Sequence, residues 1–463
     1  LMLFNSDTFL WFLLAFTLLY FVTRQNLSRR NWLILVASYC FYGWWDWRFL
    51  FLLLGSSLID FYVGLALKKN AEAKIQKRLV TLSLGANLGA LGIFKYFDFF
   101  SESLQTILTT LGLEVSTPML NVILPVGISF YTFQSLSYTL DIYRKKLEPT
   151  NNLTAFLAYV AFFPQLVAGP IERASNLLPQ FLTARKVTQQ SMEMGIWLII
   201  WGLFKKVVLA DNFGALSDMV YEDQGAEGAI VYFGTIAFGF QIYCDFSGYS
   251  DVARGLAYMM GFNLMVNFNL PYFATSPSDF WRRWHISLST WFRDYLYIPL
   301  GGNRGGSSAM MRNLLITMLV AGLWHGAGWN FVLWGLWHGM MLCLFPSIPL
   351  PRRMQPLLGW FLTMIIIFYG WLLFRAQSMD HIMALTTSLF TWSFPLWIGS
   401  YILNLAVFMT PLLAMQIWQH RTNTIFPMLP HNRMIKSALM AICVIMTTVF
   451  WNTKGTPFIY FQF

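Results

Sequence analysis

Long apolar runs, separated by short polar loops, dominate this sequence and restrict what it can fold into. A stretch of about 20 apolar residues is enough to cross a bilayer as a helix. The runs lie at residues 9–22, 32–45, 49–67, 79–100, 121–142, 153–169, 192–210, 229–244, 252–266, 312–324, 328–345, 357–374, 397–418 and 434–451. Several of them are too short to cross alone. We therefore expect one all-α polytopic membrane domain over residues 1–463, with about 10 to 13 transmembrane helices plus re-entrant or interfacial helices.

The composition excludes a soluble enzyme. Hydrophobic residues make up 57% of the 463 residues and charged residues only 11%, whereas soluble chains are about 25% charged. The formal net charge is +10, but no soluble basic module is visible, so we expect membrane lipids and no nucleic acid as partners. Each of the four cysteines stands alone in apolar sequence, which predicts core residues and no metal site.

Basic residues gather in three early clusters, at residues 24–30, 68–78 and 144–146. The segments between them, at 44–47 and 101–118, are poor in Lys and Arg. Positive clusters mark loops on the cytoplasmic side of a membrane. This pattern places the N-terminus outside. The first run lacks a basic segment before it, so we expect a retained transmembrane helix rather than a cleaved signal peptide.

Two polar stretches interrupt the apolar runs in ways that suggest function. Pro164, Gly169 and Pro170 cannot belong to one straight helix, and they indicate either a break at membrane depth or a loop at a helix end. The segment 241–251 carries Asp245 and Tyr249 beside an apolar run. An acid inside the membrane is a functional candidate, whereas a helix cap with an exterior turn is the structural alternative.

A third polar stretch, residues 276–304, begins like a helix. Ser276 is the expected N-cap, Pro277 the first helical residue, and Asp279 the partner in a capping box. The spacing then predicts one continuous helix with an apolar stripe that faces the bundle interior or the membrane interface. The stripe consists of Trp281, Trp284, Leu288, Trp291 and Tyr295, and Arg282, Arg283 and Arg293 lie off it, with His285 at its border.

The histidines fall into two groups. His381, His420 and His431 have polar neighbours and are expected to be solvated, whereas His285, His325 and His338 lie in apolar or aromatic sequence. The glycines around His325 would let a substrate chain approach the imidazole, or they would allow close helix packing with His325 bonded to a carbonyl. On a continuous helix His325 and His338 would not share a face, so we expect only one of them to meet the substrate.

The motifs together resemble the membrane-bound O-acyltransferase (MBOAT) family, in particular its bacterial polysaccharide O-acetyltransferase branch, which includes the membrane subunit of alginate O-acetyltransferase. The resemblance rests on WHGAGWNFVLWG, on WRRWHISLSTWFRDYLYIP, on FPQLVAGPI, and on SYCFYGWW and TPFIYFQF towards the two ends. It implies that His325 is catalytic and that His285 is the second polar residue of the active site, and it does not assign His338 to the catalytic position. Gly328 stands where relatives often have Ala.

The resemblance also implies a reaction and a location. In acyl transfer to a hydroxyl, a His of ordinary pKa near 6.5 is suited to take the hydroxyl proton. His325 would activate the acceptor, or a hydroxyl on a relay protein, while His285 and Asn330 orient the acyl group and stabilise the oxyanion. Trp324, Asp245 and Tyr249 are further candidates for substrate binding. Arg282, Arg283 and Arg293 would attract the phosphates of the donor, or simply anchor the helix to headgroups.

The expected protein is thus an O-acetyltransferase of the bacterial inner membrane, with no tightly bound cofactor and with acetyl-CoA as the acyl donor. Its partners would be a periplasmic acetyltransferase and an exported polysaccharide such as alginate. Two alternatives stay open: transfer of D-alanyl or another acyl group from a carrier protein to a cell-envelope polymer, and a transporter of the acyl donor without chemistry. A transporter often shows an internal repeat, and none is visible here.

Overall fold

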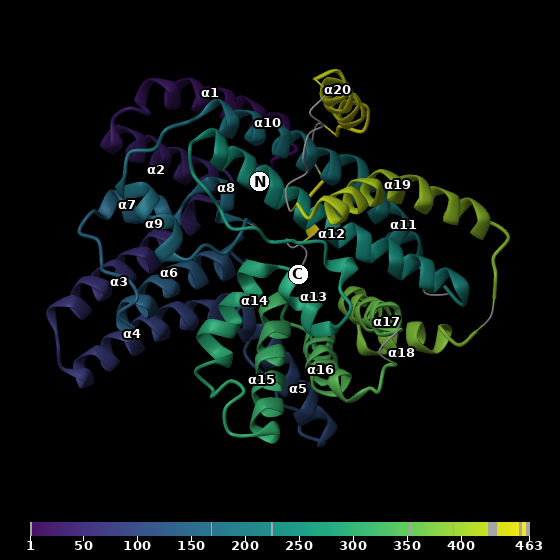
Figure 1. The fold of residues 1–463 in the computed structure, drawn as a ribbon. Helices are drawn as coiled ribbons and strands as arrows, with labels where there is room; N and C mark the ends of the chain where they lie inside the picture. Colours follow the sequence, from purple (N-terminus) through teal and green to yellow (C-terminus); the bar gives the residue numbers. More distant parts are fainter. Residues whose placement is uncertain are drawn as a thin grey trace. The chain divides into compact units, whose positions relative to one another are not determined.

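The computed structural model describes residues 2–167, 169–223, 226–351, 354–391, 393–424, 433–452 and 456–459. In this part of the chain all regular secondary structure is helical (Figure 1). The described residues form two compact units, one of residues 1–196 and 253–265 and the other of residues 197–252 and 266–463. The all-α fold is confirmed, and the single acyltransferase domain stays a prediction.

The first unit contains the N-terminal helices. These are α1 Asp7–Thr23, α2 Leu27–Gly43, α3 Leu50–Lys69, α4 Ala73–Leu91, α5 Phe97–Thr110, α6 Ile128–Tyr143, α7 Leu153–Val160, α8 Phe163–Leu166 and α9 Ala174–Leu182, with the 3₁₀-helix η1 Trp47–Phe49 and the π-helix η2 Gly92–Tyr96. Helix α10, Gln189–Leu203, continues from the first unit into the second. The apolar run at 121–142 is helical only from Ile128, because Pro125 and the left-handed Gly127 precede that helix.

The second unit holds the candidate site. Its helices are α11 Asp211–Tyr221, α13 Pro277–Arg283, α14 Ile286–Phe292, α15 Ser307–His325, α16 Trp329–Leu344, α17 Gln355–Arg375, α18 Met379–Ser388, α19 Ile398–Thr422 and α20 Arg433–Val449, with the π-helices η3 Phe204–Ala210 and η5 Arg293–Tyr297 and the 3₁₀-helices η4 Pro271–Phe273 and η6 Phe345–Ser347. Helix α12, Ala229–Met259, passes from this unit into the first.

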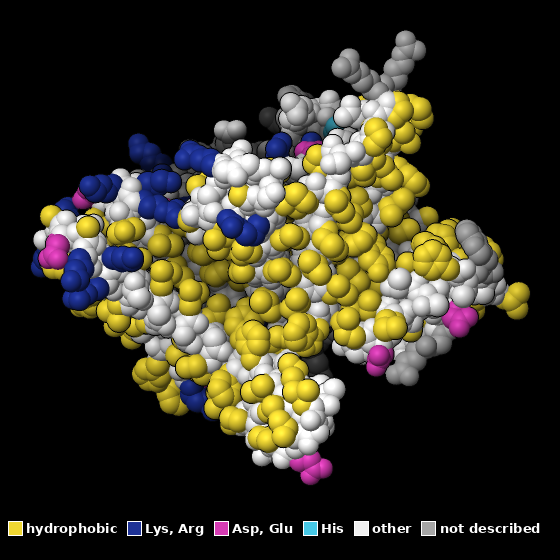
Figure 2. Space-filling view, turned by 90° about the horizontal axis from the view of Figure 1, so that it is seen from below, with side chains coloured by type: hydrophobic (Ala, Val, Ile, Leu, Met, Phe, Trp, Pro, Cys, Tyr) yellow, Lys and Arg dark blue, Asp and Glu magenta, His cyan; other side chains and the backbone are white. Residues whose placement is uncertain are grey.

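Six of the described helical segments are long and apolar enough to cross a membrane. They are Trp47–Lys69, Ala73–Thr110, Ala229–Met259, Ser307–His325, Gln355–Arg375 and Ile398–Thr422, and shorter apolar helices lie at Asp7–Thr23, Leu153–Leu166 and Met434–Val449. Hydrophobic side chains are abundant among the residues drawn in Figure 2. The polytopic architecture is confirmed, whereas the number of true crossings, expected at 10 to 13, stays a prediction.

A buried acid joins three helices of the first unit. Asp60 on α3 is fully buried, and its carboxylate accepts hydrogen bonds from Ser83, from Asn87 Nδ2 at 3.1 Å and from Thr139 Oγ1 at 3.0 Å. Ser83 and Asn87 belong to α4, and Thr139 belongs to α6. Side-chain hydrogen bonds of this kind hold transmembrane helices together where the hydrophobic effect offers no preference.

The proline-rich segment 163–173 forms the expected break. Helix α8 ends at Leu166, and α9 begins only at Ala174. The side chain of Glu172 is fully buried between them and accepts hydrogen bonds from the backbone of Met265 and from Asn176 Nδ2 at 2.7 Å. The described residues of this break are buried. The position of the break, at membrane depth or as a loop at a helix end, stays a prediction.

In the second unit, the segment 241–251 lies inside α12 and is not a turn. The structural alternative of an exterior turn around Gly248 is therefore wrong, because α12 continues without interruption. Two buried lysines of η3 neutralise its acids: Lys206 Nζ lies 2.7 Å from Asp245 Oδ1, and Lys205 Nζ lies 2.7 Å from Asp251 Oδ2. An opposite charge within hydrogen-bond distance makes a buried carboxylate tolerable.

Candidate functional site

A tight helical hairpin places His325 in the second unit. Helices α15 and α16 are joined by only three residues, Gly326 to Gly328, and pack along each other (Figure 1). Two glycines permit this approach, because a Cβ at Gly322 would lie 2.2 Å from Phe331 O and one at Gly335 would lie 2.3 Å from Met318 O. Small residues at such contacts let helix backbones come close. Glycine near His325 therefore serves helix packing.

His325 is the last residue of α15 and lies in an aromatic enclosure. Its imidazole is 5% exposed. The ring centroids of Trp324, Trp334 and Phe374 lie 5.0, 5.0 and 5.3 Å from that of His325, all at steep angles. Such edge-to-face contacts fix the orientation of a ring. Aromatic packing therefore holds the imidazole of His325 in place.

The helix expected over 276–295 is broken at His285, so the prediction of one continuous helix was wrong. Ser276 caps α13 as expected, since its Oγ accepts a hydrogen bond from Asp279 N at 3.1 Å. Helix α13 nevertheless ends at Arg283, and α14 begins at Ile286. Between them His285 adopts φ +42° and ψ +54°. His is among the few residues that enter this left-handed region with any frequency.

Asn267 holds the break at His285 in place. Its backbone oxygen accepts a hydrogen bond from Ile286 N at 2.9 Å, and its Oδ1 accepts another from Ser287 Oγ at 2.7 Å. Asn267 Nδ2 in turn donates to Ser250 Oγ on α12 at 3.1 Å. Strained backbone persists where surrounding contacts over-determine it, and such positions cluster at functional sites.

The break turns the imidazole of His285 towards the same aromatic cluster. The side chain is 1% exposed. Its ring stands perpendicular to Phe246 with centroids 4.5 Å apart, and lies 5.8 Å from Trp324. Because the indole of Trp324 also contacts His325, both imidazoles pack against the same ring. The structure therefore brings His285 close to Trp324 and His325, which come much later in the sequence.

The other predicted substrate-binding residues are engaged elsewhere. Asn330 Nδ2 donates to the carbonyl of Ala376 at 3.1 Å and to that of Phe374 at 3.4 Å. Since the Phe374 ring packs on His325, Asn330 binds the backbone that carries one of the rings around His325. Asp245 binds Lys206, as described above, and its Oδ2 accepts a hydrogen bond from Ile459 N at 2.6 Å. A role for Asn330 and Asp245 in substrate binding stays a prediction.

Tyr249 and the three arginines have different surroundings. The Tyr249 ring packs on Phe458 at 5.1 Å. Arg283 Nε is paired with Asp279 Oδ1 at 2.9 Å, one helical turn earlier. Arg293 Nε is bonded to Asp294 at 2.8 Å, and both Arg282 and Arg293 are exposed. Donor binding by these arginines stays a prediction.

Several residues that shape the site were missed by sequence reasoning. Phe246 and Asn267 contact or position His285, and Lys206 neutralises Asp245. The only sequence signal was the pair of lysines within the apolar run 192–210, since buried lysines require acidic partners. His381 is partly exposed and His420 exposed, whereas His431 lies outside the described residues. Among the residues described, no cluster of His, Cys, Asp and Glu is suited to a metal ion.

Comparisons with known proteins agree with a polytopic helical membrane enzyme. The profile of the membrane-bound O-acyltransferase family matches residues 146–386. The chain is 43% identical to a probable alginate O-acetylase of Pseudomonas aeruginosa, over 82% of this chain and 73% of the relative. It is 36% identical to a peptidoglycan O-acetyltransferase of Helicobacter pylori, over 82% and 78%.

A more distant relative, a teichoic acid D-alanyltransferase of Streptococcus thermophilus, is 26% identical over 64% of this chain and 81% of its own length. The fold and these comparisons define a multi-pass membrane enzyme that transfers acyl groups to hydroxyls. The chain belongs to the membrane-bound O-acyltransferase family.

Proposed function

We propose that this protein transfers acetyl groups from a cytoplasmic donor, acetyl-CoA, towards an exported polysaccharide across the bacterial inner membrane. The transfer is completed by a periplasmic partner protein, and the N-terminus lies outside. The observation that carries the proposal is the contact of both His325 and His285 with Trp324 in a buried aromatic enclosure. Its support from relatives is the 43% identity to a probable alginate O-acetylase.

In this reaction His325 is the general base. It takes the proton of an acceptor hydroxyl as the oxygen attacks the thioester carbonyl, so that a C–O bond forms and the C–S bond breaks. The proton then passes to the departing thiolate, which leaves as the free thiol of coenzyme A. His285 orients the acyl group and stabilises the charge that develops on the carbonyl oxygen. A water-excluding enclosure strengthens both effects, because charges interact more strongly at low dielectric constant.

The proposal is tested by the release of free thiol from acetyl-CoA by the detergent-purified protein. We expect His325→Ala to lower this rate at least a hundredfold, the usual size of a general-base contribution. His381→Ala, which removes a partly exposed imidazole of the same unit, should leave the rate unchanged. Equal rates for wild type and His325→Ala would contradict the assignment. A protein that only moves the donor would release no thiol.

Transfer of D-alanyl groups is the second candidate, because teichoic acid D-alanyltransferases are among the relatives. It would require a carrier protein as donor in place of coenzyme A. Comparing free acetyl-CoA with a D-alanyl-loaded carrier protein in the same assay separates the two functions. Release from the carrier alone would favour D-alanyl transfer.

A further inference from the structure

The residue that begins helix α14 does not cap it. His285 stands at the N-cap position, where the side chain of Ser, Thr, Asp or Asn usually accepts a hydrogen bond from the first backbone amides. The imidazole of His285 makes no such hydrogen bond. Asn267, from a separate segment of the second unit, serves the first amides instead. Its backbone oxygen accepts from Ile286 N at 2.9 Å, and its Oδ1 accepts from Ser287 N at 3.4 Å. The start of α14 is therefore capped without the imidazole.

The backbone is paired with one short segment on both sides of His285. Asn269 N donates to Arg283 O at 2.9 Å before the break, and Asn267 O accepts from Ile286 N after it. These two pairings fix the chain on either side of the left-handed residue. Strained backbone persists only where the surrounding structure over-determines it. The segment that carries Asn267 and Asn269 therefore imposes the conformation of His285.

Asn267 is itself fixed to helix α12. Its Nδ2 donates to Ser250 Oγ at 3.1 Å, while its Oδ1 accepts from Ser287 Oγ at 2.7 Å. The three side chains are at most 2% exposed, and hydrogen bonds are stronger in such a low-dielectric setting. Ser250 follows Phe246 by four residues, so both lie on one face of α12. Since the Phe246 ring contacts the imidazole of His285, this face holds the ring directly and its backbone through Asn267.

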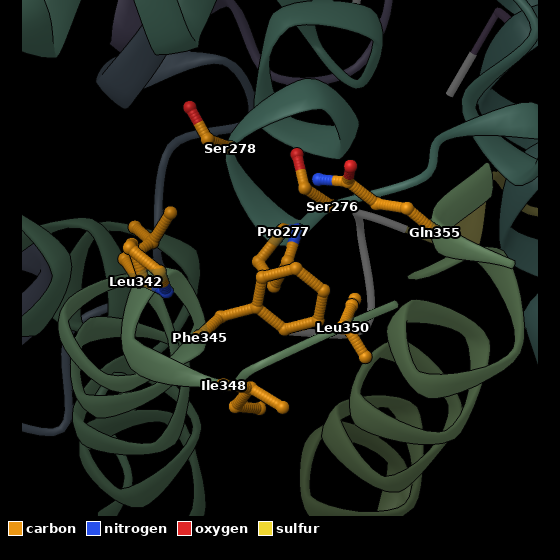
Figure 3. A pocket seen from close by; sticks show the side chains of 9 residues that line it. Ser276, Pro277, Ser278, Leu342, Phe345, Ile348, Leu350 and Gln355 are labelled. Atoms are coloured by element: carbon orange, nitrogen blue, oxygen red, sulfur yellow. The ribbon is translucent and has the colours of Figure 1, made fainter. Parts of the chain in front are cut away.

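The hydrogen-bonded residues do not line the pocket of the second unit that Figure 3 shows. That pocket has a volume of about 260 Å³ and is lined by side chains at the start of α13 and along the connection between α16 and α17. Asn267, Ser250 and Ser287 are buried and absent from its lining. Their arrangement therefore points to an action on His285 rather than to contact with a ligand in that pocket.

We propose that Asn267 is a positioning residue of the acyl-transfer site, which links α12 to the backbone at His285 and thereby aims its imidazole at the acyl group. This inference rests on the proposed function, in which His285 stabilises the charge on the carbonyl oxygen. A displacement of about 1 Å in such a group can cost about a hundredfold in rate. The loss falls on kcat, because this charge develops only in the transition state.

The experiment compares thiol release from acetyl-CoA by Asn267→Ala and by wild type. We expect kcat to fall about 10- to 100-fold, with the KM for acetyl-CoA unchanged. In the His285→Ala background the same substitution should have no further effect on kcat, because Asn267 acts only through that imidazole. Equal losses of kcat in the two backgrounds, or a raised KM with an unchanged kcat, would overturn the proposal.

Two further variants and a control separate positioning from a loss of stability. Asn267→Asp should recover most of kcat, because its two oxygens can accept hydrogen bonds from both serine hydroxyls. Ser287→Ala removes a single hydrogen bond and should lower kcat in the same way, which keeps the test open if Asn267→Ala does not fold. Asn313→Ala is the matched control, since Asn313 is equally buried and its Nδ2 donates to Gly302 O at 3.0 Å. It should lower the unfolding temperature and not kcat, and an equal loss of kcat would overturn the proposal.

Labelling with diethyl pyrocarbonate reports the position of His285 without any acyl transfer. The reagent modifies accessible imidazoles, and mass spectrometry reads each histidine separately. His285 and His338 are each 1% exposed, so we expect labelling in Asn267→Ala to rise at His285 but not at His338, and at neither in Asn313→Ala. Unchanged labelling of His285 would overturn the inference. If labelling rises although wild type releases no thiol, the proposed function fails and Asn267 still positions His285.

Discussion

Lys206 Nζ lies 2.7 Å from Asp245 Oδ1, and the other oxygen of Asp245 accepts a hydrogen bond from the backbone of Ile459. Lys206 Nζ also donates to Pro457 O at 3.3 Å. Lys206 Nζ lies 2.9 Å from Asp211 Oδ1 as well. This buried lysine therefore joins η3, the start of α11, α12 and the segment 456–459. Phe458 of that segment packs on Phe246, the ring that stands against His285, so the pair reaches the candidate site through two aromatic contacts.

Breaking this pair should destabilise the protein strongly. Removal of one partner leaves an uncompensated buried charge, and we expect Lys206→Met to lower the free energy of unfolding by about 3–5 kcal/mol. Thermal unfolding in detergent measures the effect. The free energy of unfolding of the double variant Lys206→Met/Asp245→Leu should fall by less than the sum of the decreases in the two single variants. If the decreases add within about 0.5 kcal/mol, the two residues are not coupled. The exposed pair Asp46–Arg48 serves as the control, where Arg48→Ala should have little effect.

The hairpin of α15 and α16 should not tolerate a side chain at Gly322. A Cβ there would lie 2.2 Å from Phe331 O, a backbone atom that can move only with its helix. We expect Gly322→Ala to reduce stability by about 1–3 kcal/mol through overpacking and to reduce thiol release, because His325 lies three residues further on. Gly85→Ala on α4 is the matched control, since a Cβ there meets nothing within 4 Å. Equal unfolding temperatures for the two variants would refute the close packing.

The hydrogen-bonded cluster at Asp60 should contribute to the stability of the first unit. Asp60→Ala leaves the donors of Ser83, Asn87 and Thr139 without their acceptor, which costs about 1–3 kcal/mol for a buried group. Asp60→Asn keeps one acceptor oxygen and should therefore lose less stability than Asp60→Ala. Thermal unfolding again provides the measurement, with Glu102→Ala on the exposed face of α5 as the control. If Asp60→Ala and Glu102→Ala unfold at the same temperature, the cluster contributes nothing.

The contribution of Glu172 to stability should fall as the pH rises, whereas acids with a lowered pKa in the folded state contribute more at higher pH. Burial raises its pKa from 4.5 to about 7, although hydrogen bonds from Met265 N and Asn176 and the charges of Arg173 and Arg254 oppose the shift. The folded state then binds the proton more tightly than the unfolded state. The contribution of Glu172 to the free energy of unfolding is complete below about pH 4.5. It declines by about 3 kcal/mol in total as the pH rises to about 7.

The measurement for Glu172 is the unfolding temperature of wild type and Glu172→Gln between pH 5 and pH 8. The variant carries no titratable group at this position, so its stability should fall less than that of wild type over this range. Parallel curves for the two proteins would mean that Glu172 stays ionised in the fold.

The fold class followed from the apolar runs because membrane helices satisfy their backbone within the segment, so that their existence is a local property. The break at 163–173 was also predictable, because Pro164 and Pro170 prevent a straight helix whatever surrounds them. The break at His285 was not predictable from spacing. Its apolar stripe fits a continuous helix, and the interruption depends on Asn267, which contacts Ile286 and Ser287 from outside that helix.

The surroundings of the acids were likewise beyond the reach of sequence patterns. Asp245 sits in a segment with the composition of a turn, yet Lys206 from another helix allows it to remain inside α12. His338 was set aside because a continuous helix would point it away from His325. The loop 326–328 reverses the chain instead, so both histidines contact Trp334.

The left-handed backbone at His285 places two demands on a single position. A residue there has to supply the chemistry of its side chain and also tolerate a conformation that most side chains find sterically costly. Asparagine meets the second demand almost as well as glycine does, whereas alanine or a β-branched residue would redirect the start of α14. Local sterics therefore limit which side chains can occupy position 285, independently of their reactivity.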